Sequence, residues 1–173
     1  KERADSLAKT INFEQVTPPS ALNPDTLFLE GENTTHYSII DKHGNVVSNT
    51  YTLGYSFGSG VTIPGTGILL DNQMNNFAYQ YGNPEVIDRS ASIGNRLEPG
   101  KRPMSTMTPV IIFDENNELK LITGSPGGAL IPAAVLRLVT GVIDFNLNLG
   151  EATMLPRLHK DWPYKNLRLE KGF

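Results

Sequence analysis

The sequence predicts a single domain of the α+β class, and three observations support this. Two pairs of short apolar segments are each joined by a turn-forming stretch, which is typical of antiparallel β-hairpins. A long apolar stretch around residues 129–145 follows the second pair and has the length of a helix. Hairpins with helices favour layers of antiparallel sheet covered by helices. The 173 residues suit one domain with a substantial core.

The first half of the chain predicts a helix, a linker and a hairpin. Residues 1–11 form the helix, because Leu7 and Ile11 lie one turn apart, and "TPPS" and "NPDT" mark residues 12–33 as a linker. The strands "THYSII" and "VVSNTYTL" are joined at "DKHGN", which supplies Asp, Gly and Asn for a tight turn. The glycine-rich "GSGVTIPGTGILLDNQM" is interpreted as a loop leading into a strand. Residues 78–100 are irregular and long enough for a lid.

The second half predicts another hairpin and the main helix. The strands "TPVIIF" and "LKLITG" are joined by "DENNE", and the second strand continues into "SPGG" and the helix around 129–145. Residues 150–169 are expected to hold a further short helix and a final strand.

Composition narrows the classes of function. A net charge of −3 and a pI near 5.6 give no basic face for nucleic acid or an anionic membrane. The absence of cysteine excludes disulfides and thiolate metal sites. Arg137 and Asp144 interrupt the apolar stretch, which indicates a buried helix and no membrane segment. His36, His43 and His159 lack metal-ligand spacing, so we expect no metal and no cofactor.

Hydroxyl side chains gather where the first predicted hairpin opens. Thr34 precedes one strand, and Thr52 ends its neighbour. A threonine becomes a competent nucleophile when it is the first residue of its chain, because its own α-amino group then takes the proton. That requires cleavage between Asn33 and Thr34, with Thr52 near enough to orient the hydroxyl. The alternative is that these threonines are only strand-favouring residues.

Two further segments offer polar groups. Gly127 and Gly128, in "TGSPGG", lie at a strand-to-helix junction, where consecutive amides bind an oxyanion or a phosphate. The segment lacks the Gly-Lys-Ser/Thr ending of a nucleotide-binding loop, which makes phosphate the weaker option, and a plain glycine turn is the alternative. Ser105 and Thr106, in "KRPMSTMTP", can grip a carboxylate or can belong to a solvated loop.

These segments, in this order, resemble the γ-glutamyltransferases (γ-glutamyltranspeptidases) of the N-terminal-nucleophile hydrolase superfamily. The matching motifs are "TTHYS", "DKHGNVVSNTYTL", "FGSG", "GILLDNQMNNF", "KRPMSTMTP", "TGSPGG" and "PRLH…LRLEKG", from about residue 31 to 172. The resemblance implies a four-layer αββα sandwich made from a precursor that cuts itself into two subunits. Residues 1–33 would be the tail of the large subunit, and residues 34–173 the small catalytic subunit, truncated at its C-terminus.

The resemblance also implies roles for individual residues. Thr34 would be the nucleophile, supported by Thr52, and the amides of Gly127 and Gly128 would form the oxyanion hole. Residues that would bind the donor substrate lie in two segments: Gln73 and Asn76 at its α-amino group, and Ser105 and Thr106 at its α-carboxylate. The stretch around 79–95 takes the place of a lid.

Three positions depart from the family pattern. An aspartate that commonly neutralises the donor's ammonium is Asn76 here, an asparagine after the supporting threonine is Gly54, and the second serine of a pair is Thr106. Losing the carboxylate should weaken recognition of an ammonium.

The expected activity is autocatalytic cleavage at Asn33–Thr34, followed by transfer or hydrolysis of γ-glutamyl groups through a γ-glutamyl-threonine intermediate. The expected partners are a small γ-glutamyl donor such as glutathione, an amine or water acceptor, and the large subunit from the same precursor. The family alone implies a periplasmic or secreted location. The alternatives are a relative with another acyl donor, such as a poly-γ-glutamate-cleaving enzyme or a β-lactam side-chain acylase, and a non-catalytic, unprocessed binding module.

Overall fold

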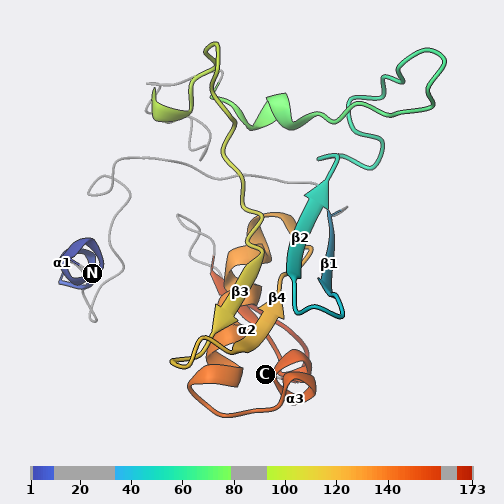
Figure 1. Ribbon diagram of the computed structural model, residues 1–173. Helices are drawn as coiled ribbons and strands as arrows, with labels where there is room; N and C mark the ends of the chain where they lie inside the picture. The colour runs from blue at the N-terminus through green and yellow to red at the C-terminus, as the bar shows by residue number, and fades with distance from the viewer. Residues whose placement is uncertain (1, 10–33, 79–92, 161–166, 173) are drawn as a thin grey trace.

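The computed structural model describes residues 2–9, 34–78, 93–160 and 167–172. The helices and strands in chain order are α1 (Glu2–Ala8), β1 (Thr34–Ile40), β2 (Val46–Thr52), β3 (Val110–Phe113), β4 (Leu119–Thr123), α2 (Ile131–Ile143), α3 (Leu149–Met154), β5 (Leu158–Lys160) and β6 (Leu167–Leu169) (Figure 1). Short 3-10 helices are η2 (Gln73–Asn76), η4 (Ile93–Asn95) and η5 (Gly128–Leu130). These helices and strand pairs confirm the predicted α+β class. The predicted linker at 12–33 and residues 79–92 of the predicted lid lie outside the described residues.

In each of the two predicted hairpins, an aspartate side chain stabilises the turn. In the β1–β2 turn, Asp41 Oδ1 accepts hydrogen bonds from the backbone N–H groups of His43 (2.8 Å) and Asn45 (2.9 Å). In the β3–β4 turn, Asp114 Oδ1 accepts from the N–H groups of Asn116 (2.8 Å) and Glu118 (2.9 Å). An aspartate at the start of a turn satisfies backbone donors that the strands leave unpaired, so both hairpins follow from local sequence.

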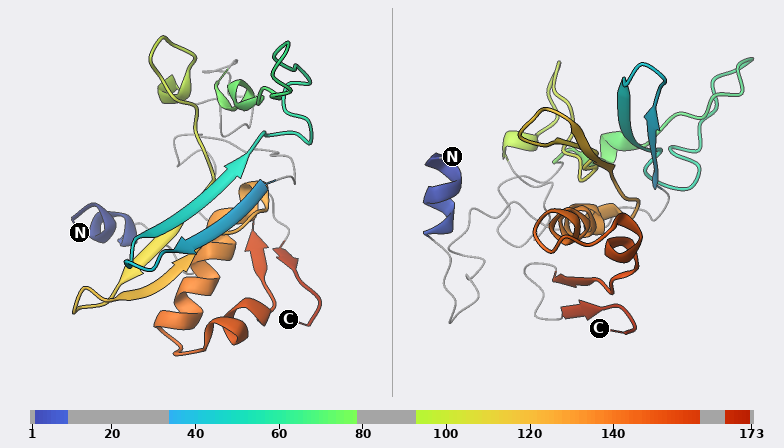
Figure 2. Two further views of the ribbon diagram at one scale, coloured as in Figure 1. Left: turned by 45° about the vertical axis from the view of Figure 1, so that its right-hand side comes forward. Right: turned by 60° about the horizontal axis from the view of Figure 1, so that its bottom comes forward.

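The two hairpins lie side by side, and helices cover one of them. Ser48 of β2 donates its hydroxyl hydrogen to the Thr123 carbonyl of β4 at 3.0 Å, which joins the hairpins without extending one sheet into the other. Helix α2 lies against the β3–β4 hairpin, and β5–β6 lies on the other side of α2 (Figure 2).

The buried apolar residues that the structure describes fall into two groups, Phe77 and Ala78 after η2, and a larger group around α2. Ile131 is fully buried, and Val135 and Leu121 are nearly so. Gly141 of α2 meets Ala152 of α3 closely, since a β-carbon at Gly141 would lie 3.1 Å from that of Ala152. The Gly141–Ala152 contact packs the C-terminal end of α2 against α3, while the burial of Ile131, the first residue of α2, holds the start of the helix and the loop that enters it. No helix within the described ranges has the length and hydropathy needed to span a membrane.

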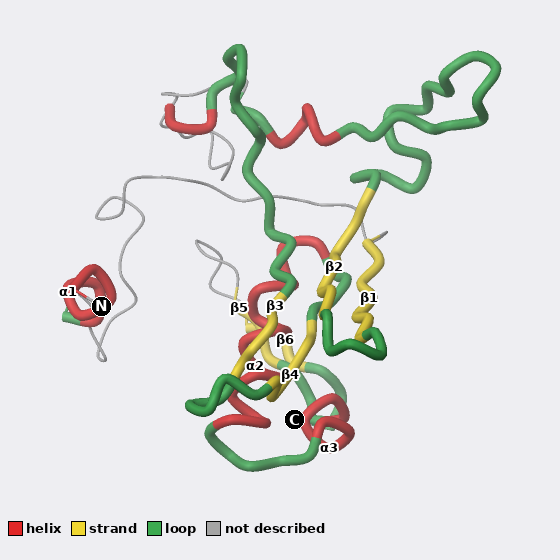
Figure 3. The backbone as a smooth tube through the Cα atoms, viewed as in Figure 1, coloured by secondary structure: helices red, strands yellow, loops and turns green. Residues whose placement is uncertain are grey.

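The strand predicted after the first glycine-rich loop is wrong. Between β2 and η2 the chain forms only an isolated bridge, between Thr62 and Leu69 (Figure 3). Gly58, Gly65 and Gly67 have φ of +57°, +77° and +72°, values that place each residue outside the extended region. These glycines belong to the predicted loop, and the apolar run that follows it, residues 68–70, pairs only through the Thr62–Leu69 bridge.

Candidate active site

β1 and β2 place two threonine side chains opposite each other at the open end of their hairpin. The register pairs Thr34 with Thr52, and these residues are only 8% and 9% exposed. Directly opposed residues in an antiparallel pair have β-carbons about 4.5–5.5 Å apart. Thr52 Oγ1 also accepts a hydrogen bond from the Gly54 N–H at 3.0 Å. The predicted nucleophile therefore faces its predicted supporting residue, while Asn33, on the other side of the predicted cleavage bond, lies outside the described residues.

The same face of the hairpin is polar over three successive pairs, from Thr34–Thr52 to Ser38–Ser48, and becomes apolar only at the Ile40–Val46 pair beside the turn. Its members alternate along the two strands: Thr34, His36 and Ser38 on β1, and Ser48, Thr50 and Thr52 on β2. Hydrogen bonds join His36 Nδ1 to Thr50 Oγ1 at 2.8 Å and His36 Nε2 to Ser38 Oγ at 3.1 Å. Burial lowers the pKa of His36, which favours the neutral imidazole. The side chains on the opposite face are largely apolar and about half exposed.

The glycine loop between β4 and α2 has a backbone conformation that requires glycine. Gly127 and Gly128 have φ of +129° and +56°, and the Leu130 N–H donates to the Gly127 carbonyl at 3.0 Å to begin η5. A φ of +129° is open to glycine alone. Amides in such a turn, at the start of the 13-residue helix α2, favour a negatively charged group.

This loop begins beside the polar face of the first hairpin. Thr123, the last residue of β4, accepts the hydrogen bond from Ser48, and the next residue, Gly124, lies directly against the His36 ring. The strand that carries Thr34 and the loop that carries Gly127 are thus neighbours, although some 90 residues separate them in the sequence.

Gln73 and Asn76 lie in η2 and are connected to the second predicted binding segment. Asn76 Nδ2 donates to Gln73 Oε1 at 3.0 Å and to the Met104 carbonyl at 3.3 Å. Met104 directly precedes Ser105. The two segments predicted to bind the α-amino and α-carboxylate groups of a donor are therefore held together by Asn76.

Thr106 connects these segments to the glycine loop. Its hydroxyl donates to the Gly128 carbonyl at 3.0 Å. Ser105 is exposed, and its Oγ accepts a hydrogen bond from the Met107 N–H at 3.1 Å. Ser105 is therefore the more accessible of the two hydroxyls for a ligand, whereas Thr106 is engaged with the backbone that carries the Gly128 amide.

The structure gives a reason for glycine at position 54. Gly54 has a φ of +84°, and a β-carbon there would overlap Oδ1 of Asn72. Asn72 Oδ1 accepts a hydrogen bond from the Tyr55 N–H at 3.1 Å, and the Asn72 N–H donates to the Leu53 carbonyl at 3.0 Å. Asn72 thus fills the space that a side chain at position 54 would need and ties the end of β2 to η2.

Four residues that hold this arrangement were not predicted as site residues: His36, Thr50, Asn72 and Asn95. Asn95 accepts from the Met104 N–H at 3.0 Å and donates to the Asn76 carbonyl at 2.6 Å, so it holds both binding segments. The alternation of polar residues at 34, 36 and 38 with those at 48, 50 and 52 was a signal for His36 and Thr50. No sequence pattern signals Asn95, because its contacts join distant segments.

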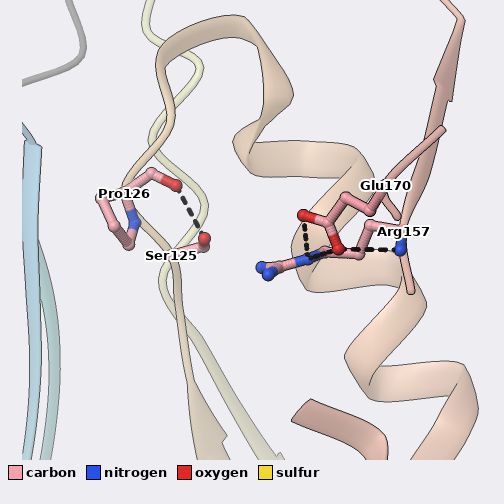
Figure 4. A network of polar contacts seen from close by, with 4 residues as sticks. All are labelled: Ser125, Pro126, Arg157 and Glu170. Atoms are coloured by element: carbon pink, nitrogen blue, oxygen red, sulfur yellow. Dashed lines mark hydrogen bonds and ion pairs between the residues drawn. The ribbon is translucent and has the colours of Figure 1, made fainter. Parts of the chain in front are cut away.

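The glycine loop also lines a cavity of about 180 Å³ between α2 and the β5–β6 hairpin. Pro126 lies on one side of it, and the ion pair between Arg157 Nε and Glu170, at 3.0 Å, lies on the other (Figure 4). Among the predicted site residues that the structure describes, only Gly127 lines this cavity. It is therefore not the predicted donor pocket.

Comparisons with known proteins agree with this geometry. A sequence profile described as Gamma-glutamyltranspeptidase matches residues 1–173. The Glutathione hydrolase proenzyme of Escherichia coli (strain K12) is 43% identical over 174 residues, which cover 100% of this chain and 30% of that protein. The crystal structure of an acivicin-inhibited gamma-glutamyltranspeptidase matches with a TM-score of 0.70 and 44% identity, covering 79% of this chain and 72% of that one.

A second solved structure, the gamma-glutamyltranspeptidase from Pseudomonas nitroreducens complexed with L-DON, matches with a TM-score of 0.65 and 40% identity, over 75% of this chain and 66% of that one. These structural matches confirm the predicted N-terminal-nucleophile hydrolase fold. The chain spans about 30% of the length of the Escherichia coli relative. With a profile match over its whole length and this level of identity, the chain belongs to the γ-glutamyltranspeptidase family.

Proposed function

We propose that the protein is an autoprocessing γ-glutamyl transferase or hydrolase in which Thr34 is the nucleophile. The observation that carries this proposal is the position of Thr34: nearly buried, opposite Thr52, on a hairpin face that adjoins the start of the Gly127–Gly128 loop. Family membership supplies the reaction class, and the relatives named glutathione hydrolase suggest glutathione-like donors.

The chemistry follows from this arrangement. The Thr34 hydroxyl attacks the γ-amide carbonyl carbon of the donor while its own α-amino group takes the hydroxyl proton. The oxygen that becomes negative is stabilised by the amides of Gly127 and Gly128. The C–N bond then breaks, the amine leaves with the proton, and a γ-glutamyl ester on Thr34 remains. Water or an acceptor amine attacks that ester and releases the γ-glutamyl group.

The proposal requires that Thr34 be freed by cleavage of the Asn33–Thr34 bond. Residues 1–33 would then end the large subunit, and residues 34–173 would belong to the small subunit. The relatives named proenzymes support a precursor that matures, and with it a large-subunit partner. Gln73, Asn76, Ser105 and Thr106 would bind the donor, and a periplasmic or secreted location remains our expectation from the family.

Mass spectrometry and N-terminal sequencing of the full-length protein test the proposal. The wild-type protein should yield two chains, with the new N-terminus at Thr34. The Thr34→Ala variant should stay as one chain without activity, and Thr34→Ser should cut slowly and keep some activity, because it retains a hydroxyl. A new terminus at Thr35, or an uncut wild-type protein, would contradict the assignment, and the latter would favour the non-catalytic binding module.

One observation favours a second candidate, a relative with a different acyl donor. Asn76 donates an amide N–H to the Met104 carbonyl. The predicted binding position of the donor's α-amino group therefore contains a neutral side chain where the family commonly has a carboxylate. Hydrolysis of a γ-glutamyl anilide, compared with that of N-acyl amides without an α-ammonium, separates the two. Faster turnover of the latter would identify this second activity.

A further inference from the structure

Strand β1, which carries Thr34, meets the segment that leads into the glycine loop at the contact between His36 and Gly124. The three atoms nearest to a β-carbon built on Gly124 all belong to the His36 ring, and the farthest of them, Cγ, would be 2.8 Å away. Gly124 does not have a positive φ. An alanine is therefore excluded from position 124 by the imidazole and not by the backbone conformation.

Both edges of the imidazole are held. Nδ1 is hydrogen-bonded to the hydroxyl of Thr50, which is only 8% exposed, and Nε2 to the hydroxyl of Ser38. These partners lie on the same hairpin face as Thr34, so the ring cannot rotate away from Gly124 without losing a hydrogen bond. His36 also lies two residues from Thr34 on that face.

A second contact fastens the hairpin to the same point of the loop. Ser48 Oγ donates to the Thr123 carbonyl, one residue before Gly124. The hydrogen bond draws the hairpin toward β4, while the His36 ring limits how closely the two can approach. Together they fix the spacing between β1 and the segment that leads to Gly127.

From this geometry we infer that His36 is a positioning residue, whose ring, seated on Gly124, sets the distance between the Thr34 nucleophile and the Gly127–Gly128 amides. The inference rests on the proposed function, since it assigns these groups to one reaction. A change of about 1 Å in such a distance lowers the rate by as much as about a hundredfold. Of the predicted donor-binding residues, Gln73 and Asn76 lie on another segment, and Thr106 is hydrogen-bonded to Gly128 and moves with the loop, so we expect the larger effect on kcat.

A double-mutant cycle in the full-length protein tests this inference, with variants His36→Ala, Gly124→Ala and the combination of both. Rates with a γ-glutamyl anilide are divided by the amount of processed enzyme. Each single variant should lower kcat about tenfold to a hundredfold and leave KM within about twofold. The combined variant should have a kcat no lower than that of His36→Ala, because the alanine methyl occupies space that the ring has vacated.

Gly150→Ala is the control, because Gly150 is exposed in α3, its φ is not positive, and the nearest atom to its β-carbon would be Asn148 Oδ1 at 3.2 Å, whereas a β-carbon at Gly124 would overlap the His36 ring. A combined His36→Ala/Gly150→Ala variant should lose kcat by the product of the two single losses, and its kcat should not recover. A combined His36→Ala/Gly124→Ala variant whose kcat loss equals the product of the single losses overturns the inference, as does an unchanged kcat in Gly124→Ala or an effect confined to KM. If Gly124→Ala does not fold, a folded double variant supports the inference, and an unfolded one overturns it.

The same cycle separates this inference from the proposed function. Absence of turnover in the wild-type protein would contradict the proposed function. The melting temperatures of the four proteins would still report whether the ring and the methyl group compete for one space.

Discussion

Replacing Asn76 with aspartate tests how this chain would recognise the α-ammonium of a γ-glutamyl donor. Asn76 is 7% exposed, and its Nδ2 donates to Gln73 Oε1 and to the Met104 carbonyl. Aspartate carries an oxygen in the place of that nitrogen, so both donated hydrogen bonds are lost. The backbone stays anchored, because Asn95 donates to the Asn76 carbonyl.

The cost in the free protein can be worked from these contacts. The Gln73 amide can rotate to present its N–H₂ group to the carboxylate, which restores one hydrogen bond. The Met104 carbonyl has no such freedom, and a buried polar group left without its partner costs about 1–3 kcal/mol. The free energy of unfolding of Asn76→Asp should fall by about that amount.

This destabilisation should depend on pH. Facing a carbonyl oxygen in a nearly buried position raises the pKa of the new carboxyl group, since the protonated form can donate to that oxygen. The folded protein then holds a proton that the unfolded chain releases, so the stability of the variant, relative to wild type, falls as the pH rises above about 4. Chemical denaturation at several pH values measures this.

Whereas Asn76→Asp destabilises the free protein, it should strengthen binding of a donor that carries an α-ammonium. A bound α-ammonium gives the carboxylate a cationic partner, and a charged hydrogen bond exceeds a neutral one by about 1–1.5 kcal/mol. The KM of a γ-glutamyl anilide should therefore fall about tenfold relative to that of its glutaryl analogue, which lacks the ammonium. Asn75→Asp is the control, because it adds the same charge at an exposed neighbouring position. If Asn76→Asp leaves the ratio of the two KM values where Asn75→Asp leaves it, position 76 does not sense the ammonium, and the reasoning is refuted.

Further variants test the glycine loop and its support. Gly127→Ala should lower kcat more than Gly128→Ala does, because alanine cannot adopt a φ of +129° but can adopt +56° at a cost in energy. The loss of one oxyanion donor lowers kcat about a hundredfold to a thousandfold. If both variants keep the wild-type kcat, the loop has no catalytic role and is only a turn. Thr106→Val should lower stability and kcat by removing the hydrogen bond to the Gly128 carbonyl, and Thr106→Ser should retain both. A rise in KM alone for Thr106→Val would assign this hydroxyl to the substrate instead.

The parts of the fold that the sequence predicts are those stabilised by local contacts. Both hairpins were predicted from their turns, and in each an aspartate binds the backbone of residues two and four positions later. Helix α2 was predicted from its length and apolar pattern. The strand predicted after the glycine-rich loop does not form, because its apolar run is short and the glycines just before it have positive φ, outside the extended region.

For the site, sequence reasoning identifies residue types, and the structure supplies the contacts between segments. That Thr34 and Thr52 face each other follows from the hairpin register alone. That Asn76 reaches Met104, that Thr106 reaches Gly128 and that Gly124 meets His36 depend on how segments distant in sequence fold together, which no local pattern encodes.

The orientation of the β1–β2 hairpin has a consequence for how its register is specified. A hairpin usually buries its apolar face, and a slip of one residue is prevented because it would expose that face. Here the side chains of Tyr37 and Ile39 are about half exposed, and the polar face lies toward β4. Within the described residues, the register is therefore held by the Asp41 turn and by the polar contacts of His36 and Ser48. Because a slip would carry Thr34 to the other face, the side chains that fix the register are also those that place the nucleophile.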